Sequence, residues 1–262
     1  MKPVGHARER ILILCRATPA DSHKYGDTVC VAGITEGGEF RRIYPVPFRQ
    51  FEKGGGIPFH KKEWIEATLS RPEATDKRRE SRKIDMSSIK VLSKATDSDV
   101  RSVLDPVVSP SIAKLTEENA SLGVIRPRII SYRVEVLDTN LFTSQRTLPN
   151  EAGHSGRTGK VKLGQESYYE FVCLNREGCS CENKPHEMQL LDWEINELYR
   201  HVVERAKDLY EIKTKMRAKM FDWMVSERDI YFVMGTHHRF GNWMVVSILY
   251  PKGGADEPSY AT

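Results

Sequence analysis

The stretch CLNREGCSCENKPHEMQLLDWEINELY, residues 173–199, places three cysteines and a histidine directly before a strongly patterned helical segment. The spacing is Cys173-x5-Cys179-x-Cys181-x4-His186. Thiolate sulfur and imidazole nitrogen are the ligands that zinc prefers, and a structural zinc site needs four ligands. The loop is rich in Gly, Asn and Pro, so a bound metal would contribute to its folding. The spacing therefore predicts a zinc knuckle made of Cys173, Cys179, Cys181 and His186.

The single residue between Cys179 and Cys181 leaves a second ligand set open, because both sulfurs need not reach one ion. That set combines Cys173, Cys181 and His186 with a fourth ligand from elsewhere, such as His154 or Asp192. The plain alternative is three cytosolic thiols and a surface histidine. A disulfide is less favoured, since the first residues, MKPVGHARER, lack the apolar core of a secretory signal.

After His186 the apolar pattern becomes helical and predicts a helix from about Met188 to Lys207. The apolar residues that recur at steps of three and four are Leu191, Ile195, Leu198, Val202, Ala206 and Leu209. Asp192 and Glu194 lie early, where carboxylates suit the positive end of a helix. They could form a catalytic acidic pair, but residues two apart on a helix point in different directions. Capping, or orienting a ligand, is the favoured role.

The combination just described resembles a poorly characterised family of bacterial proteins. The residues that carry the resemblance are Cys173, Cys181, His186 to Met188, Asp192 to Glu194, Leu198 and Tyr199, together with RIYPVPFR at 42–49, Phe232, GTHHRF at 235–240 and Trp243. The similarity covers nearly the whole chain. It implies a metal-knuckle-like element and carries no established activity, and Cys179 lies outside its pattern.

Composition indicates an ordinary soluble globular protein. The chain has 262 residues, of which 39% are hydrophobic and 29% charged. A net charge of +4 is compatible with a polyanionic partner but does not by itself indicate one. No apolar run is long enough to cross a membrane. We expect a cytoplasmic protein with no membrane association.

The chain divides into a β-rich part, a connecting part and a knuckle-bearing part, at residues 1–95, 96–167 and 168–262. Short apolar segments predict strands at about 10–17, 28–34, 39–44, 64–69 and 89–92. Gly37 and Gly38 predict a hairpin, and Pro45 and Pro47 are expected to end its ladder. Several short strands joined by turns predict a small barrel or strongly curved sheet. The fold class is therefore α+β, with a barrel-like half followed by helices, a β-hairpin and the knuckle.

Basic residues gather in the first part of the chain and favour contact with nucleic-acid phosphates. The candidates are Arg41, Arg42, Arg78, Arg79, Arg82 and Lys83. A solvated charged loop is the plain alternative for the run at 76–83.

Near the end of the chain, apolar segments at 230–234 and 243–249 predict a hairpin covered on both faces. Its tip, GTHHRFG at 235–241, frames His237, His238 and Arg239 with glycines. These side chains could bind phosphate, exchange protons or supply a metal ligand. A polar surface turn is equally compatible with the pattern.

Three functions remain open, and no complete catalytic constellation is visible. The first is a nucleic-acid-binding protein with a structural zinc knuckle. The second is a nucleic-acid or nucleotide hydrolase that uses Asp192, Glu194 and His238. The third is a non-enzymatic subunit that docks a protein partner through the methionine-rich helix near 212–224 or the segment Tyr44–Phe48.

Overall fold

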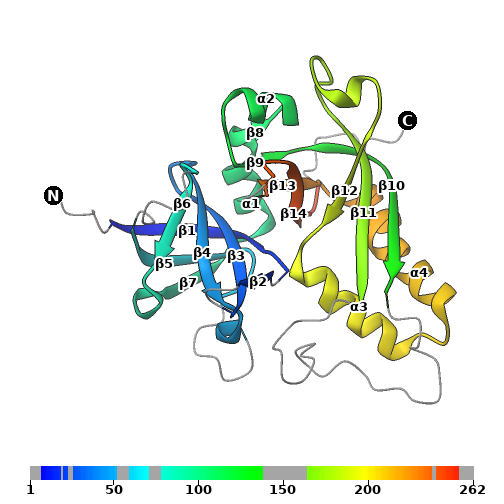
Figure 1. The fold of residues 1–262 in the computed structure, drawn as a ribbon, viewed down its shortest axis with the longest axis horizontal. Helices are drawn as coiled ribbons and strands as arrows, with labels where there is room; N and C mark the ends of the chain where they lie inside the picture. Colours follow the sequence, from blue (N-terminus) through cyan, green and yellow to red (C-terminus); the bar gives the residue numbers. More distant parts are fainter. Residues whose placement is uncertain are drawn as a thin grey trace.

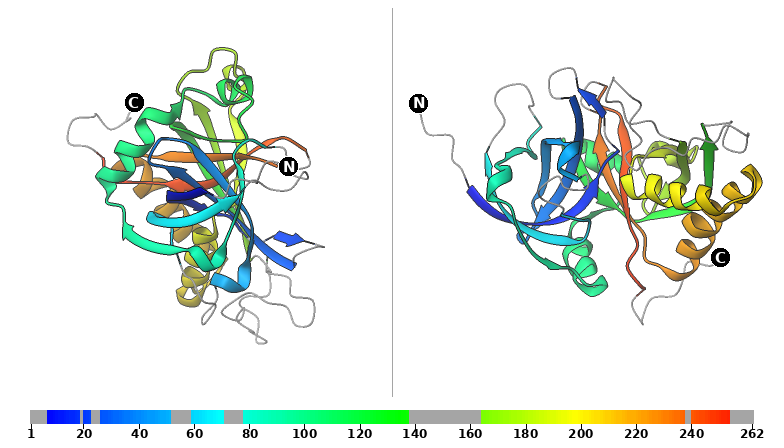
Figure 2. Two further views of the ribbon diagram at one scale, coloured as in Figure 1. Left: turned by 90° about the vertical axis from the view of Figure 1, so that its left-hand side faces the viewer. Right: turned by 90° about the horizontal axis from the view of Figure 1, so that it is seen from below.

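The computed structural model describes residues 7–18, 20–22, 26–51, 59–70, 78–137, 164–237 and 240–253. They form an α+β fold in which a barrel, a second sheet and a layer of helices follow one another (Figures 1 and 2). Within these ranges no helix combines the length and apolar character needed to cross a bilayer.

The first sheet is built from the N-terminal part of the chain. Its strands are β1 (Ala7–Arg16), β2 (Ala20–Ser22), β3 (Gly26–Thr35), β4 (Phe40–Pro47), β5 (Glu63–Ser70), β6 (Ser81–Ile84) and β7 (Lys90–Lys94). Short 3-10 turns η1 (Phe48–Phe51) and η2 (Met86–Ser88) lie between them.

Five of these strands close into a barrel in the order β1-β3-β4-β6-β5, with β5 pairing back onto β1. Strands β4 and β6 are parallel, whereas the other pairs are antiparallel. A five-stranded Greek-key barrel with this connectivity is the architecture of OB-folds. The predicted barrel-like half is therefore confirmed.

The β3–β4 hairpin turns at Gly38, whose φ of +80° favours glycine. Gly33 permits close approach of β1 and β3, because a Cβ there would lie 2.4 Å from Ile11 Cγ2. The expectation that Pro45 ends the ladder is wrong, since β3 and β4 pair as far as Thr28 and Pro47. A shift of register between Val29 and Val31 lets Pro45 be accommodated, and Pro47 lies in the last pair of the ladder.

The second sheet has the order β10-β11-β12-β14-β13-β9-β8. Its strands are β8 (Val108–Ser109), β9 (Leu122–Ile125), β10 (Pro127–Val136), β11 (Gln165–Cys173), β12 (His186–Leu190), β13 (Tyr231–Thr236) and β14 (Trp243–Leu249). The predicted C-terminal hairpin is β13–β14.

The helices are short. They are α1 (Asp97–Leu104), α2 (Ile112–Glu117), α3 (Trp193–Arg205), α4 (Leu209–Arg217), a π segment η5 (Ala218–Trp223) and α5 (Met224–Glu227), with 3-10 turns η3 (Asp105–Val107) and η4 (Ser180–Glu182). The predicted helix start near Met188 is wrong. Residues 186–190 form strand β12 because they pair with β11, and α3 begins only after Asp192, which caps it.

Three hydrophobic cores hold these layers together. Within β1, Ile11 and Ile13 pack inside the barrel, whereas Leu12 and Leu14 pack in a core shared with the second sheet. Strand β13 alternates likewise, with Tyr231 facing the shared core and Phe232 the helical layer. The outer face of β3 also contributes to the shared core, so the second sheet covers that side of the barrel.

Candidate functional site

The four predicted metal ligands come together at one end of the second sheet. Cys173 ends β11, and His186 begins β12, where it pairs with Phe171. Between them the turn η4 folds the chain so that Cys179 and Cys181 both join the cluster. The ligand atoms of all four side chains lie within 4.8 Å of one another. The chain therefore has a buried Cys3His cluster able to hold a metal ion.

The distances among Cys173, Cys179 and His186 are close to the edges of a tetrahedral site. A tetrahedron with metal–sulfur bonds of about 2.3 Å has sulfur–sulfur edges of about 3.8 Å. The sulfurs of Cys173 and Cys179 are 3.9 Å apart, and His186 Nε2 lies 3.7 and 3.3 Å from the same two sulfurs. All three cysteines are free thiols and not disulfides.

Helix α2 supports the cluster from outside. Burial raises the pKa of the Cys173 thiol, although a hydrogen bond from the Ile112 backbone opposes that rise. Burial also acts to raise the pKa of Cys179, but hydrogen bonds from the backbone of Cys181 and Ala113 outweigh it, and the net pKa is lowered. Burial lowers the pKa of His186, which keeps the imidazole neutral and able to bind metal.

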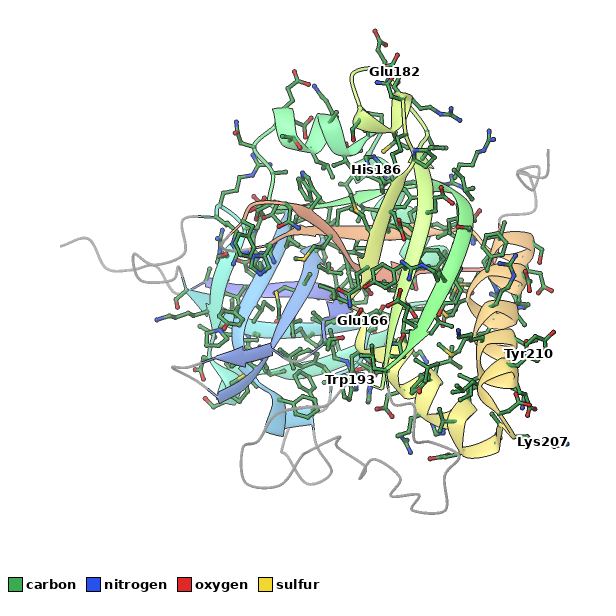
Figure 3. All side chains as sticks on the ribbon, turned by 45° about the vertical axis from the view of Figure 1, so that its right-hand side comes forward. Glu166, Glu182, His186, Trp193, Lys207 and Tyr210 are labelled. Atoms are coloured by element: carbon green, nitrogen blue, oxygen red, sulfur yellow. The ribbon has the colours of Figure 1, made fainter. Side chains whose placement is uncertain are left out.

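The alternative ligand set is not the one that the structure assembles. Asp192 lies beyond the far end of β12, and Figure 3 shows the neighbouring Trp193 well away from His186. His154 lies outside the described residues.

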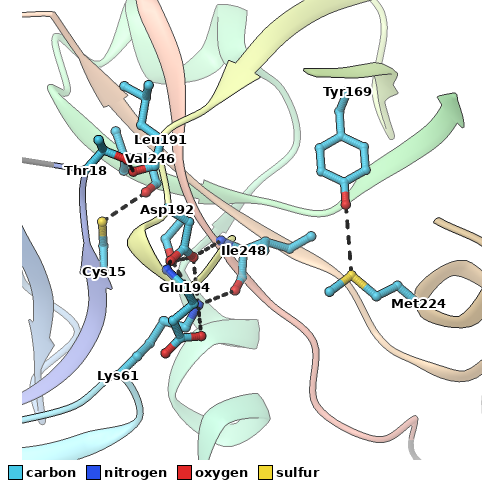
Figure 4. Close-up of polar contacts among 11 residues, drawn as sticks. Cys15, Thr18, Lys61, Tyr169, Leu191, Asp192, Glu194, Met224, Val246 and Ile248 are labelled. Carbon is cyan, nitrogen blue, oxygen red and sulfur yellow. Dashed lines mark hydrogen bonds and ion pairs between the residues drawn. The ribbon is translucent and has the colours of Figure 1, made fainter. Parts of the chain in front are cut away.

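Asp192 instead belongs to a buried charge cluster that joins the two halves of the molecule (Figure 4). Its Oδ2 accepts hydrogen bonds from Lys61 Nζ at 2.7 Å, Ser247 Oγ at 2.6 Å and the Ile248 N–H at 3.2 Å. Lys61 Nζ also lies 2.8 Å from Glu194 Oε2. Burial lowers the pKa of Lys61, but the two carboxylates outweigh it and raise the pKa overall.

This arrangement makes Asp192 a structural group. Its side chain is 1% exposed and also caps α3 through the Glu194 N–H. The Lys61 side chain is 5% exposed, so neither group of this ion pair is open to a substrate. Sequence reasoning missed Lys61, because a lysine in the polar run His60-Lys61-Lys62-Glu63 looks solvent-exposed.

The basic run at 78–83 forms the turn before β6 and the start of that strand. The Arg79 side chain is 65% exposed, and Arg82 donates to the carbonyl oxygens of Arg79 and Ser81. Glu80 points inward and accepts hydrogen bonds from the N–H and hydroxyl of Ser121. Burial raises the pKa of Glu80, but these hydrogen bonds outweigh it and the net pKa is lowered.

The hairpin tip lies against this basic turn. Arg78 Nη1 donates to the Thr236 carbonyl at 3.3 Å, and the Thr236 N–H donates to the Ser121 carbonyl. At the tip the rings of His237 and Phe240 stack with centroids 4.8 Å apart. Two segments that are about 150 residues apart in sequence, and that we predicted separately, therefore form one surface. His238 and Arg239 lie outside the described residues.

The remaining arginine candidates are engaged inside the protein. Arg41 is buried and pairs with Glu9 and Glu39, whereas Arg42 is buried and donates to the Ser121 carbonyl. Lys83 lies in β6 opposite Ser70.

The proposed protein-docking segments are largely internal. The methionine-rich face contributes to the core under the second sheet through Ile212, Met216, Met220 and Met224. In the segment Tyr44–Phe48, Val46 and Phe48 are buried in the barrel.

Family comparisons divide the chain in two. Residues 7–106 match a family model described as Domain of unknown function (DUF8758), and residues 111–261 match Domain of unknown function (DUF8757). Both are uncharacterised families, in agreement with the resemblance seen in the sequence. No curated protein sequence is significantly similar to the chain.

One solved structure aligns over most of the length. It is described as "Structure of murine DNA binding protein bound with ds DNA", with 11% identity, coverage of 96% of this chain and 98% of that chain, and a TM-score of 0.32. At this TM-score the likeness is too low to bear on fold or function.

Proposed function

This chain belongs to the family described as Domain of unknown function (DUF8757), and from the geometry of its own residues we propose that it binds nucleic acid through the basic turn and the hairpin tip. We call this surface the basic rim and define it as Arg78, Arg79, Arg82, His237 and Phe240. A structural zinc ion in the Cys3His cluster completes the proposal.

The observation that carries the proposal is the contact between Arg78 and Thr236. It places cations of the turn beside the aromatic tip. The acidic residue within the turn, Glu80, is 5% exposed and accepts hydrogen bonds from Ser121 and, at 3.3 Å, from Arg79 Nε, so its carboxylate is turned away from solvent. A cluster of arginines with one inward-facing acid favours phosphate binding through counterion release.

The position of the rim within the barrel gives independent support. OB-folds bind oligonucleotides through the face of their second and third strands and through the loops after the first and fourth strands. Here Arg78 and Arg79 lie in the connection between β5 and β6, which corresponds to the loop after the fourth strand. The strand face is covered by the second sheet, so binding is confined to the rim.

The test is a titration of labelled DNA and RNA oligonucleotides, followed by fluorescence anisotropy at two salt concentrations. Changing Arg78, Arg79 and Arg82 together to alanine should weaken binding. On a duplex it should also reduce the salt slope by about 0.9 for each phosphate that the variant no longer neutralises. The matched control changes Lys94, Lys207 and Lys213 to alanine, which are exposed and lie outside the rim. Equal weakening in the two triple variants would point to net charge alone and would defeat the assignment.

Zinc is the metal we propose for the Cys3His cluster. Three thiolates and one imidazole form a closed tetrahedral set, which is typical of structural zinc and leaves no open position for substrate. A reducing compartment such as the cytoplasm would keep the cysteines available as ligands.

Elemental analysis of protein purified without chelators tests this part. We expect about one zinc per chain, and a large loss of zinc in Cys181→Ser. Cys30→Ser, which changes a cysteine outside the cluster, is the matched control and should keep its zinc. Less than about half an equivalent in the unaltered protein would count against a standing site.

A further inference from the structure

Phe240 is unusual at the basic rim, because its residue surface is 73% exposed while its ring stacks on another side chain of the rim. The ring stacks on His237 with an interplanar angle of 18°. The Phe240 N–H donates to His237 Nδ1 at 3.3 Å. Single exposed apolar residues are common on protein surfaces, so exposure alone would indicate nothing.

The backbone on either side of the tip is hydrogen-bonded to itself. Gly241 has a φ of +71°, and its N–H donates to the His237 carbonyl at 2.9 Å. The His237 N–H in turn donates to the Asn242 carbonyl at 2.9 Å. These hydrogen bonds join the backbone of His237 to that of Gly241 and Asn242, next to the aromatic pair.

Resting on the nucleic-acid binding proposed above, we propose that Phe240 is a stacking platform for an unpaired base, and that the partner is single-stranded nucleic acid. Bases in a single strand can leave the stack and lie on an aromatic ring, while the adjacent arginines hold the backbone. In a duplex the bases are already stacked on one another, and reaching one would cost unstacking energy.

The covered barrel face limits how much strand can be bound. The outer face of β3 contributes to the core shared with the second sheet, so a strand cannot run across it. The binding site is then restricted to the few nucleotides that pass the tip and the basic turn. Base stacking at one ring accordingly represents a large share of the affinity.

The experiment compares Phe240→Ala, Phe240→Leu and Phe240→Tyr by fluorescence anisotropy. The probes are an oligo(dT) of about 12 nucleotides, an oligo(rU) of the same length, an abasic strand of the same length and a duplex. Circular dichroism verifies that each variant folds. Loss of a stacked base is worth about 1–3 kcal/mol, which corresponds to roughly 5- to 150-fold in affinity.

We expect Phe240→Ala and Phe240→Leu to weaken single-strand binding by that factor, while Phe240→Tyr retains it. Binding of the abasic strand and of the duplex should not change, nor should the salt slope, because no charge is removed. The oligo(dT) and oligo(rU) arms show whether DNA or RNA is preferred.

The outcomes distinguish failure of the stacking role of Phe240 from failure of nucleic-acid binding itself. If Phe240→Ala leaves single-strand affinity unchanged, or weakens duplex and single strand equally, the stacking role is overturned. The arginine variant would still weaken binding in that case. If the unaltered protein shows no salt-dependent binding to any probe, the nucleic-acid function fails and the stacking role fails with it.

Discussion

At the scale of single residues, Asp192 shows how one carboxylate serves two purposes. One oxygen caps α3, and the other accepts hydrogen bonds from Lys61, Ser247 and the Ile248 N–H. Lys61 comes from the barrel half, whereas Ser247 and Ile248 belong to β14. The barrel, the second sheet and the start of a helix therefore meet at a single side chain.

Asp192→Ala should lower the free energy of unfolding by about 3–5 kcal/mol, because it leaves the buried Lys61 ammonium with one of its two carboxylates. Urea denaturation measures the change. The double variant Lys61→Met with Asp192→Ala is the control and should cost less than the sum of the single changes. Strictly additive costs would show that the two groups are not coupled.

Glu80 gives the stability a dependence on pH. Its pKa is below its usual 4.5, so its ionised form stabilises the folded state above about pH 4.5, and this contribution is lost as the pH falls through the folded pKa. Urea midpoints measured from about pH 7 down to pH 3 should fall less steeply in Glu80→Gln. The pKa of Asp97 is also lowered, by Lys62 first, so some slope will remain. An identical slope in the variant would contradict the role given to Glu80.

At the scale of elements, the knuckle and α2 depend on each other. The backbone of Ile112 and Ala113, at the start of α2, acts to lower the pKa of Cys173 and Cys179, and the Asn175 N–H donates to the Pro110 carbonyl. Loss of the proposed zinc would leave these thiols to protonate and would weaken the contact between the cluster and the helix.

Hydrogen exchange with mass spectrometry tests this dependence. After chelation, peptides covering 110–117 and 173–186 should both lose protection, while peptides from the barrel strands β1 and β3 should change little. Loss of protection confined to 173–186 would show that α2 is held by other contacts.

The elements also show how far sequence reasoning reached. The spacing of Cys173, Cys179, Cys181 and His186 was enough to identify the cluster, because all four ligands lie in one local loop. The start of α3 was misplaced because the helical apolar pattern that begins at Leu191 was extended back to about Met188, whereas the pairing of residues 186–190 with β11 is decided by tertiary contacts.

Contacts between segments far apart in the chain could not be predicted from the sequence either, because they too are decided by tertiary structure. Neither Lys61 with Asp192 nor Arg78 with Thr236 leaves any local pattern, since each pair is more than 130 residues apart. The predicted division at residues 95 and 167 stays a prediction.

At the scale of the whole molecule, the shared core joins the two segments that match different family models. Leu14 of β1 packs in this core with Val233 and Val246 of the second sheet, and all three are buried. We expect unfolding to occur in a single transition that destabilises both halves together.

Leu14→Ala should cost about 2–5 kcal/mol by leaving a cavity between the halves. Urea unfolding followed by tryptophan fluorescence and by far-ultraviolet circular dichroism should still give coincident transitions, shifted to lower urea. Two separate transitions would contradict a common core. Val91→Ala, at an exposed position of β7, is the control and should have a small effect.

The covered barrel face has a consequence for inheritance. The outer face of the barrel forms part of the core shared with the second sheet. If the barrel were produced without that sheet, the aliphatic side chains of Leu12, Leu14 and Ile34 would be exposed to water. We therefore expect the segment at 7–106 to occur in proteins together with the segment at 111–261, or with another domain that covers the same apolar face. In a fusion protein, a partner should therefore be joined before the first segment or after the second, and not between the two.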